Sequence, residues 1–429
     1  MRTPRTQHVS PSPSRLSVVI GAGGTGGHIY PGLALAEALL RAVPDAVISF
    51  VGTERGLETR LIPDAGFRLH TVDMIPFDPS LGARRFLLPA ALAKSGAQCR
   101  SILREQGAQV AVGMGGYPSA PVIVGARLAG LPSVIHESNA VPGRANRFAA
   151  LLTDRITLAF EAGREHLPGS RHADVVGMPI AAELAALDRR RPGLRAAARR
   201  ALGVPGRGRL VLVNGGSLGA ARLTAAATGL ARRWRDRTDV QLLIKTGPAA
   251  LAEVRGQLAA SGGDRVATAV PYLDRMDLAY AAADLAVCRA GSATVAELSA
   301  TRTPAVLVPY PYAPGDHQTH NARVLTDAGA GLLLPDAEAD AERLAALAEP
   351  LLAEPHRLTA MAAAAPGGRH ARAADLLAAH VLDLSGHTAP SPGFGSGSAS
   401  GSDSGPPPRP GTAPHLLASA PHPDSETAA

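Results

Sequence analysis

The sequence predicts an α/β protein built from two Rossmann-like domains that face a central cleft. Short β-branched runs alternate with alanine-rich helical patterns along most of the chain, which is typical of parallel sheets covered by helices. Two similar strand–glycine loop–helix units open the two halves, "SVVIGAGGTGGH" from Ser17 and "LVLVNGGSLGAAR" from Leu210. The length of 429 residues suits two domains of this kind.

Composition divides the chain into four segments. Residues 1–15 are basic and rich in Pro and Ser, and residues 387–429 are rich in Gly, Ser and Pro. Neither segment can bury enough apolar surface to fold, so we expect a disordered N-terminal arm and a disordered C-terminal tail. Residues 16–172 and 173–386 are the two expected domains. The apolar run after the arm is too short for a signal peptide, and no run has the length of a membrane-spanning helix.

The charge is positive and comes almost entirely from arginine. The formal net charge is +7, and Lys94 and Lys245 are the only lysines. This composition fits a partner that carries phosphate, but it equally fits a general use of arginine in place of lysine. Cys99 and Cys288 show no metal or redox spacing, which indicates a reducing, cytoplasmic setting. We expect no cofactor, no metal and no nucleic-acid partner.

The first glycine loop, "GAGGTGGH", connects an apolar strand directly to an apolar helix. Five glycines allow a close backbone approach to a bulky anion, and the helix N-terminus favours a phosphate there. Gly21, Gly23 and Gly26 also satisfy the dinucleotide fingerprint G-x-G-x-x-G, and Glu54 would then be the ribose-binding acid of an NAD-dependent enzyme. That interpretation leaves His28 unexplained.

A third loop of this kind, "VAVGMGGYPSAP", lies between the two halves and begins at Val110. A dehydrogenase needs one phosphate loop. Three loops spread over both halves instead favour an enzyme that holds a nucleotide diphosphate in one domain and a second phosphorylated substrate in the other. The sequence has no D-x-D, so backbone amides and helix dipoles would stabilise a leaving diphosphate.

Two stretches of the second half suit a nucleotide-sugar site. "DLAVCRAGSATVAEL" from Asp284 predicts a strand, a short loop and a helix start, where Ser292 and the first N–H groups would face a diphosphate. Thr294 and Glu297 have the spacing of a capping box, and Glu297 would also be placed to accept both ribose hydroxyls. The polar loop "VPYPYAPGDHQTHNA" from Val308 is a candidate for contacts with sugar hydroxyls.

Together these stretches resemble the bacterial undecaprenyldiphospho-muramoylpentapeptide β-N-acetylglucosaminyltransferases, the MurG family. The resemblance rests on "GGTGGHIYPGLALAEAL", "VGTERGLE", "VGMGGYPSAP", "HESNAVPGRANR", "NGGSLGA", "CRAGSATVAE" and "DHQTHNA". It implies a GT-B fold and an inverting transfer of N-acetylglucosamine from UDP-GlcNAc to the 4-hydroxyl of lipid I, which forms lipid II. It further implies peptidoglycan synthesis at the cytoplasmic face of the cell membrane, peripheral attachment there, and possible contacts with other cell-wall and division proteins.

The resemblance also implies roles for individual residues. His28 would be the catalytic base, although a contact to phosphate or a structural role stays open for it. His136 and Glu137 would shape the corner around Asn139, which would touch the donor sugar. The acceptor diphosphate would bind to two loops, formed by Gly24, Thr25 and Gly26 and by Gly115, Gly116 and Tyr117. UDP-GlcNAc would contact Thr25, Gly26, Gly27, Asn139, Ser217, Leu273, Ser292, Ala293, Thr294, Val295, Ala296, Glu297 and Gln318.

One stretch departs from the family. Its members commonly have V-G-N-P-V-R, with the arginine reaching the donor phosphate, but this chain has "VVGMPIAAEL", with Met178 and Ala181 at the Asn and Arg positions. Another arginine substitutes, donor binding is weaker, or the chain is a diverged paralogue. Such a paralogue would be a non-catalytic cell-wall scaffold or a GT-B enzyme with another acceptor, and the diphosphate-type loop at Gly115 argues against the latter.

A lipid-linked acceptor requires a docking surface for the anionic membrane. The segment from Met74 to Arg100 places apolar residues beside basic ones, as an interfacial anchor needs. The alternative is an ordinary loop followed by a core helix. The residues concerned are Phe77, Leu81, Arg84, Arg85, Phe86, Leu87, Leu88 and Lys94.

Overall fold

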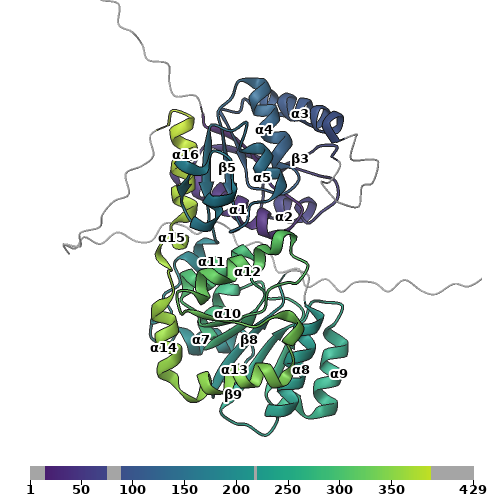
Figure 1. The fold of residues 1–429 in the computed structure, drawn as a ribbon, viewed down its shortest axis with the longest axis vertical. Helices are drawn as coiled ribbons and strands as arrows, with labels where there is room; N and C mark the ends of the chain where they lie inside the picture. Colours follow the sequence, from purple (N-terminus) through teal and green to yellow (C-terminus); the bar gives the residue numbers. More distant parts are fainter. Residues whose placement is uncertain (1–14, 75–87, 217–219, 388–429) are drawn as a thin grey trace, which may run out of the picture. The chain divides into compact units, whose positions relative to one another are not determined.

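A computed structural model describes residues 15–74, 88–216 and 220–387 of the chain. These residues form two parallel sheets with helices on their faces (Figure 1). The expected arm and tail lie almost entirely outside the described residues. Two parallel-sheet, Rossmann-like domains confirm the predicted fold class.

The first sheet has the strand order β3-β2-β1-β4-β5-β6-β7. Its strands are β1 (Ser17–Gly21), β2 (Val47–Gly52), β3 (Arg68–Thr71), β4 (Val110–Gly113), β5 (Ser133–Glu137), β6 (Arg155–Leu158) and β7 (Asp174–Val175). The helices between them are α1 (Gly26–Ala42), α2 (Glu58–Asp64), α3 (Leu88–Glu105), α4 (Ser119–Ala129) and α5 (Arg144–Ala149), with 3₁₀ turns at Glu161–His166 and Ser170–His172. The order reverses between β1 and β4, and in sheets of this kind ligands bind at the carboxyl ends of the strands where the order reverses.

The second sheet repeats this plan in the order β10-β9-β8-β11-β12-β13. Its strands are β8 (Arg209–Asn214), β9 (Val240–Lys245), β10 (Ala267–Val270), β11 (Leu285–Cys288), β12 (Ala305–Leu307) and β13 (Gly331–Leu333). The helices are α6 (Ala182–Ala185), α7 (Leu194–Ala201), α8 (Ala221–Trp234), α9 (Leu251–Ser261), α10 (Met276–Ala282), α11 (Ser292–Thr301), α12 (His317–Thr326), α13 (Ala341–Ala353), α14 (Pro355–Ala364), α15 (Gly368–Ala371) and α16 (Ala373–Leu384). Here the reversal falls between β8 and β11.

The end of the chain returns to the first domain. The apolar face of α16 buries Leu377 and Val381 in the same core cluster as Leu35 and Leu39 of α1 (Figure 1). The strand β7 also pairs with β6. The expected boundary between residues 172 and 173 therefore differs from the sheets, because β7 and α16 both follow it in sequence and both belong to the first domain.

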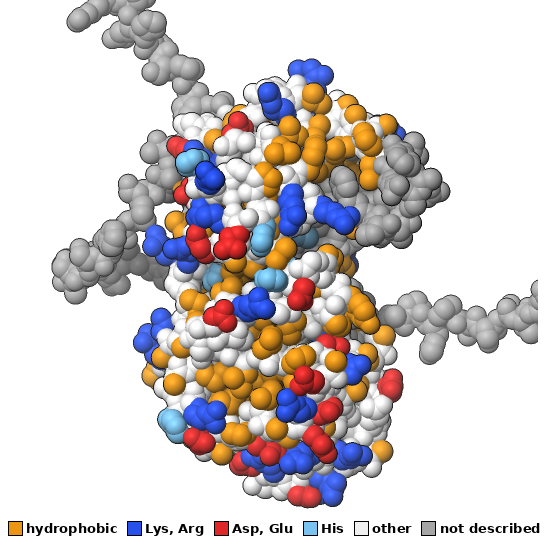
Figure 2. Space-filling view, viewed as in Figure 1, with side chains coloured by type: hydrophobic (Ala, Val, Ile, Leu, Met, Phe, Trp, Pro, Cys, Tyr) orange, Lys and Arg blue, Asp and Glu red, His pale blue; other side chains and the backbone are white. Residues whose placement is uncertain are grey.

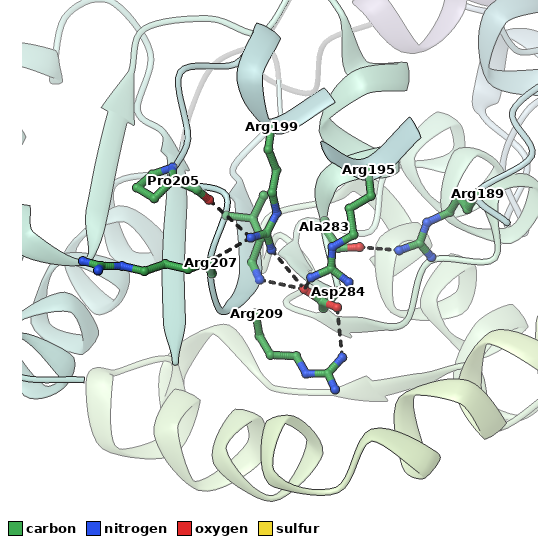
Figure 3. Close-up of polar contacts among 9 residues, drawn as sticks. Arg189, Arg195, Arg199, Pro205, Arg207, Arg209, Ala283 and Asp284 are labelled. Atoms are coloured by element: carbon green, nitrogen blue, oxygen red, sulfur yellow. Dashed lines mark hydrogen bonds and ion pairs between the residues drawn. The ribbon is translucent and has the colours of Figure 1, made fainter. Parts of the chain in front are cut away.

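A charged cluster at the amino end of β11 holds the second domain together (Figure 3). The buried carboxylate of Asp284 accepts hydrogen bonds from Arg195, Arg199 and Arg209, and from the backbone N–H of Leu210 at 2.7 Å. These contacts join α7 to the amino ends of β8 and β11. The arginine-rich stretch before Leu210 is therefore packed structure, and this edge of the sheet is opposite the one that carries the glycine loops.

Every helix among the described residues is too short or too polar to cross a bilayer.

Candidate active site

The first glycine loop places His28 at the carboxyl end of β1. Thr25 is the N-cap residue of α1 and is exposed, and Gly26 and Gly27 are its first helical residues. The Thr25 hydroxyl lies 3.3 Å from Nδ1 of His28, and the His28 backbone N–H donates to the Thr25 carbonyl at 3.1 Å. The imidazole is therefore held one turn from the start of the helix.

The loop after β4 closes against the same imidazole. Gly115 and Gly116 have φ values of 91° and 74°, a conformation that favours glycine. A Cβ at Gly115 would stand 2.8 Å from Cδ2 and 3.1 Å from Nε2 of His28, and one at Gly116 would collide with the Gly23 carbonyl oxygen. Only bare backbone fits here. The two predicted acceptor loops are thus adjacent and enclose His28, and the partly exposed Tyr117 follows them.

The buried carboxylate of Glu58, for which the sequence predicted no role, stabilises the first glycine loop. Glu58, at the start of α2, accepts from the N–H of Gly24 at 3.0 Å and from the Thr53 hydroxyl at 2.8 Å. A Cβ at Gly23 would meet its Oε1 at 2.7 Å. The side chain is fully buried, so its negative charge is compensated by these donors. Glu54, the acid of the dinucleotide interpretation, is exposed instead.

Desolvation sets the protonation state of His28. It lowers the pKa of His28 to about 4, against the effect of a hydrogen bond to the Gly23 backbone, and the nearby His317 lowers it further. The imidazole is neutral at pH 7. Thr25 and the Gly23 carbonyl lie on the Nδ1 side, so the tautomer with its proton on Nδ1 has an available lone pair on Nε2.

The corner after β5 is built from buried polar groups. The Glu137 carboxylate accepts from the N–H of Asn139 at 2.8 Å and of Gly143 at 3.2 Å, and from the Asn146 amide at 2.9 Å. Burial raises the pKa of Glu137 and lowers that of His136 to about 3. Both side chains are inaccessible, so they shape the loop that carries Asn139 and do not face a substrate.

Asn321 on α12 joins this corner to the second domain. Its Oδ1 accepts from the N–H of Ala140 at 2.8 Å, and its Nδ2 donates to Oδ1 of Asn139 and to the carbonyl of Ala290, both at 3.2 Å. Asn321 is fully buried and satisfied. The "DHQTHNA" stretch therefore includes one residue that positions Asn139 and cannot itself reach a sugar.

The start of α11 differs from the predicted capping box. The N-cap residue is Gly291, without a side-chain capping bond, and Thr294 lies inside the helix. The capping-box interpretation is therefore wrong, because the motif requires Thr294 as the N-cap and the helix begins three residues earlier. Ser292, Ala293 and Thr294 present the unpaired N–H groups of a first turn, while Val295 and Ala296 are buried in the core.

Glu297 does not form the backbone hydrogen bond that a capping box would give it. It accepts a hydrogen bond from the Tyr280 hydroxyl at 2.9 Å. Burial raises the pKa of Glu297 to about 7, although Tyr280 and Lys245 both act to lower it. Its second oxygen has no protein donor among the described residues, so Glu297 can accept hydrogen bonds from a ligand.

Two other residues that are predicted to contact UDP-GlcNAc have polar groups available for it. Oε1 of Gln318 accepts from the N–H of Ala290 at 3.2 Å and of Tyr310 at 2.9 Å, which leaves its Nε2 as a donor without a partner in the described chain. The Leu273 side chain is buried, and its backbone N–H and C=O form no hydrogen bond with another described residue. Ser217 lies outside the described residues.

The stretch that departs from the family packs as follows. Met178 is fully buried in the core, and its N–H donates to Nδ1 of His370 at 2.9 Å. Ala181 is exposed at the N-cap of α6, which packs against α11. Among the described residues, no other arginine forms a hydrogen bond or ion pair with the start of α11 in place of the missing one. The described residues contain no cluster of His, Cys, Asp and Glu that could hold a metal ion.

The fold and the site together define a nucleotide-sugar-dependent glycosyltransferase. The fold has two Rossmann-like domains, and the site has paired glycine loops around a histidine and a carboxylate behind a helix start. Residues 18–158 match the model of the glycosyltransferase family 28 N-terminal domain, and residues 210–377 match that of its C-terminal domain. The chain belongs to this family and, within it, to the MurG group that the motifs predict.

The relatives named UDP-N-acetylglucosamine–N-acetylmuramyl-(pentapeptide) pyrophosphoryl-undecaprenol N-acetylglucosamine transferase support this assignment. The one from Mycobacterium tuberculosis is 42% identical over 384 residues, which are 88% of this chain and 91% of the relative. The one from Desulforudis audaxviator is 37% identical over 381 residues, 86% of this chain and 99% of the relative. The crystal structure of Acinetobacter baumannii MurG superposes with a TM-score of 0.68 at 27% identity, covering 86% and 99% of the two chains.

Proposed function

We propose that this protein transfers N-acetylglucosamine from UDP-GlcNAc to the 4-hydroxyl of lipid I and so forms lipid II for peptidoglycan synthesis. The observation that carries the proposal is the enclosure of a neutral histidine by two glycine loops at one edge of the first sheet. A glycine loop gives a diphosphate access to backbone N–H groups, and the histidine stands beside the place where that diphosphate would bind.

The donor binds at the carboxyl edge of the second sheet. The free backbone groups of Leu273 pair with uracil, and Glu297 accepts the ribose hydroxyls with the oxygen that Tyr280 leaves open. The first N–H groups of α11 face the diphosphate, and Nε2 of Gln318 donates to a hydroxyl of the sugar. Asn139, held by Asn321, contacts the sugar from the first domain.

His28 removes the proton of the acceptor hydroxyl. The acceptor oxygen forms a bond to the anomeric carbon as the bond between that carbon and the β-phosphate oxygen breaks. The hydroxyl proton goes to Nε2 of His28, and UDP leaves with the electron pair. Attack on the face opposite the leaving group inverts the anomeric centre. The diphosphate of the bound acceptor raises the pKa of the imidazole above its value in the free protein, which makes it a stronger base.

UDP release from UDP-GlcNAc tests this proposal. We expect turnover that requires a lipid I analogue, with a disaccharide product of inverted configuration at the new bond. We expect that a lipid-linked analogue without the pentapeptide-bearing muramoyl group does not act as an acceptor. Absence of turnover with lipid I, together with UDP binding, would point to the scaffold paralogue, and turnover with a different acceptor would point to the other alternative.

We also propose that the protein docks as a peripheral protein on the anionic cytoplasmic face of the membrane. Figure 2 shows hydrophobic side chains gathered on the surface over α3 and α4. Leu128, in the last turn of α4, is 53% exposed. Residues 75–87, which include most of the predicted anchor, lie outside the described residues. Lys94 is exposed but pairs with Asp73 at 2.8 Å, so its charge is partly offset.

Sedimentation with anionic vesicles tests the docking surface. Leu128→Glu should reduce vesicle binding, because a carboxylate would enter the headgroup region, while turnover of a water-soluble acceptor stays unchanged. The matched control is Leu151→Glu, at a leucine that is 68% exposed after α5. Equal vesicle binding by wild type and Leu128→Glu would remove this surface from the proposal.

A further inference from the structure

Lys245 is a buried lysine that forms no ion pair with a carboxylate of the described residues. It is the last residue of β9, opposite Asn214 in the sheet register, and is 7% exposed. Its Nζ donates to the carbonyl of Gly216 at 3.0 Å and lies 4.7 Å from the centre of the Tyr272 ring. Among the described residues it forms no ion pair. Glu297 affects it only through a longer-range electrostatic interaction.

Such a placement is costly without a ligand. An ammonium group has three donors, and the described protein uses one of them. A buried cation loses its hydration, and one carbonyl with one aromatic face compensates for this only partly. Burial accordingly lowers the pKa of Lys245. Lysine is also rare in this chain, since Lys94 is the only other one.

The surroundings of Lys245 are those of the donor site. Gly216, which accepts its hydrogen bond, belongs to the glycine loop after β8, and the Gly216 N–H is held by Oδ1 of Asn214 at 3.0 Å. Tyr272 directly precedes Leu273, the expected uracil contact. Glu297, the expected ribose contact, is close enough to influence the charge of Lys245. The unpaired ammonium therefore lies among the groups that would surround a nucleoside diphosphate.

We propose that Lys245 is the cation that binds the diphosphate of the UDP donor and offsets the negative charge of UDP as it leaves. In this chain it does the work that the family assigns to the arginine at the position of Ala181. The proposal rests on the proposed function for the identity of the donor. It requires one charge-assisted hydrogen bond from Nζ to a phosphate oxygen, in addition to the bond to Gly216.

Ligand binding to two variants separates this role from a structural one. Lys245→Met removes the charge and both hydrogen bonds, whereas Lys245→Gln keeps a donor for Gly216 without the charge. Calorimetry with UDP and with uridine, without any acceptor, is the measurement. We expect both variants to bind UDP about 10- to 100-fold more weakly and to bind uridine as wild type does. Lys94→Met, at the exposed lysine on α3, is the matched control and should change neither affinity.

A second cation tests the exchange of roles. Lys245→Gln combined with Ala181→Arg should recover most of the lost UDP affinity, because the arginine returns at the N-cap of α6 beside α11. Wild-type UDP affinity in Lys245→Gln, or an equal loss for UDP and uridine, would overturn the proposal. These affinities are measured without an acceptor. If UDP binding depends on Lys245 but lipid I is not turned over, only the proposed function is rejected. Failure of the wild type to bind UDP would reject both.

Discussion

Glu297 combines a packing role in the fold with the ribose contact proposed for it. One carboxylate oxygen is held by Tyr280, while burial raises the pKa of the group to about 7. A ribose that donates two hydroxyls needs the ionised carboxylate. In the proposed donor site, the protonation state of Glu297 would therefore control donor binding near pH 7.

The pH dependence of nucleoside binding follows from this state. Because the pKa of Glu297 is raised to about 7, the carboxyl is mostly protonated at pH 6 and mostly ionised at pH 8. We expect uridine affinity to rise by roughly 10-fold across this range, as the acceptor of charge-assisted hydrogen bonds appears. Uridine is the suitable probe because it has no phosphate to titrate. Glu297→Gln should remove the pH step, and a step that persists in this variant would assign it to another group.

His28 gives a second prediction at the same scale. His28→Ala should lower kcat by about 10²- to 10⁴-fold and leave UDP affinity nearly unchanged. The variant loses the group that accepts the proton, but it loses no contact with UDP-GlcNAc. In the free enzyme the imidazole titrates near pH 4, so kcat/KM should not fall between pH 8 and 6 through this group. Thr25→Val, which removes only the hydroxyl near Nδ1, is the milder comparison. A His28→Ala variant with more than about a tenth of the wild-type kcat would limit His28 to a contact role.

The glycine loops show, at the scale of elements, why the sequence predicted some parts of the site and missed others. Their positions after β1, β4 and β8 follow from strand, glycine and helix patterns that are local in sequence. The Glu58 brace and the Asn321 bridge depend on contacts across 34 and 181 residues, which no local pattern specifies. The capping box failed for a related reason, since two positions with suitable spacing do not decide where a helix begins. The return of α16 to the first domain was equally invisible, because an apolar helix face does not specify its partner.

Two glycines in left-handed conformations test how tightly the acceptor loops interlock. Gly116→Ala must accommodate both a φ of 74° and a collision with the Gly23 carbonyl, whereas Gly130→Ala at the C-cap of α4 has a φ of 69° and open space. We expect Gly130→Ala to lower the free energy of unfolding by about 1 kcal/mol. Gly116→Ala should lower it by several times as much, or displace the loop and abolish turnover. Similar stabilities and full activity in both variants would show that the two loops do not interlock.

The Asp284 cluster gives a prediction for the opposite edge of the second sheet. Asp284→Asn leaves the buried Arg199, which is 2% exposed, without a counter-charge. Breaking a buried pair in this way costs about 3–5 kcal/mol. The exposed pair between Arg41 and Asp375, at 2.8 Å, is the control, and Asp375→Asn should cost under about 1 kcal/mol. Denaturant unfolding measures both values, and a loss below about 1 kcal/mol for Asp284→Asn would mean that solvent already neutralises the cluster.

At the scale of the whole molecule, burial of several histidines in neutral form links stability to pH. His136 at the end of β5 is fully buried, and His370 in α15 is 5% exposed and accepts from Met178. Burial lowers the pKa of His136 to about 3 and that of His370 to about 4, and nearby positive charge adds to both effects, from His370 on His136 and from Arg369 on His370. Each group is neutral in the folded protein at pH values where an unfolded histidine already binds a proton.

The sign of the effect follows from the proton balance. An unfolded histidine, with a pKa near 6.5, takes up a proton as the pH falls, and the folded His136 and His370 do not until about pH 3–4. Unfolding therefore consumes protons between pH 6.5 and 4, so stability is greatest above pH 6.5 and declines through this window. We expect the free energy of unfolding to fall by about 1–3 kcal/mol between pH 7 and 5, measured by urea denaturation. His136→Asn should flatten this dependence even if it lowers stability at pH 7, whereas His356→Asn, at an exposed histidine, should leave it unchanged. A stability that is constant from pH 7 to 5 would mean that these rings protonate readily in the folded protein and are not held neutral by burial.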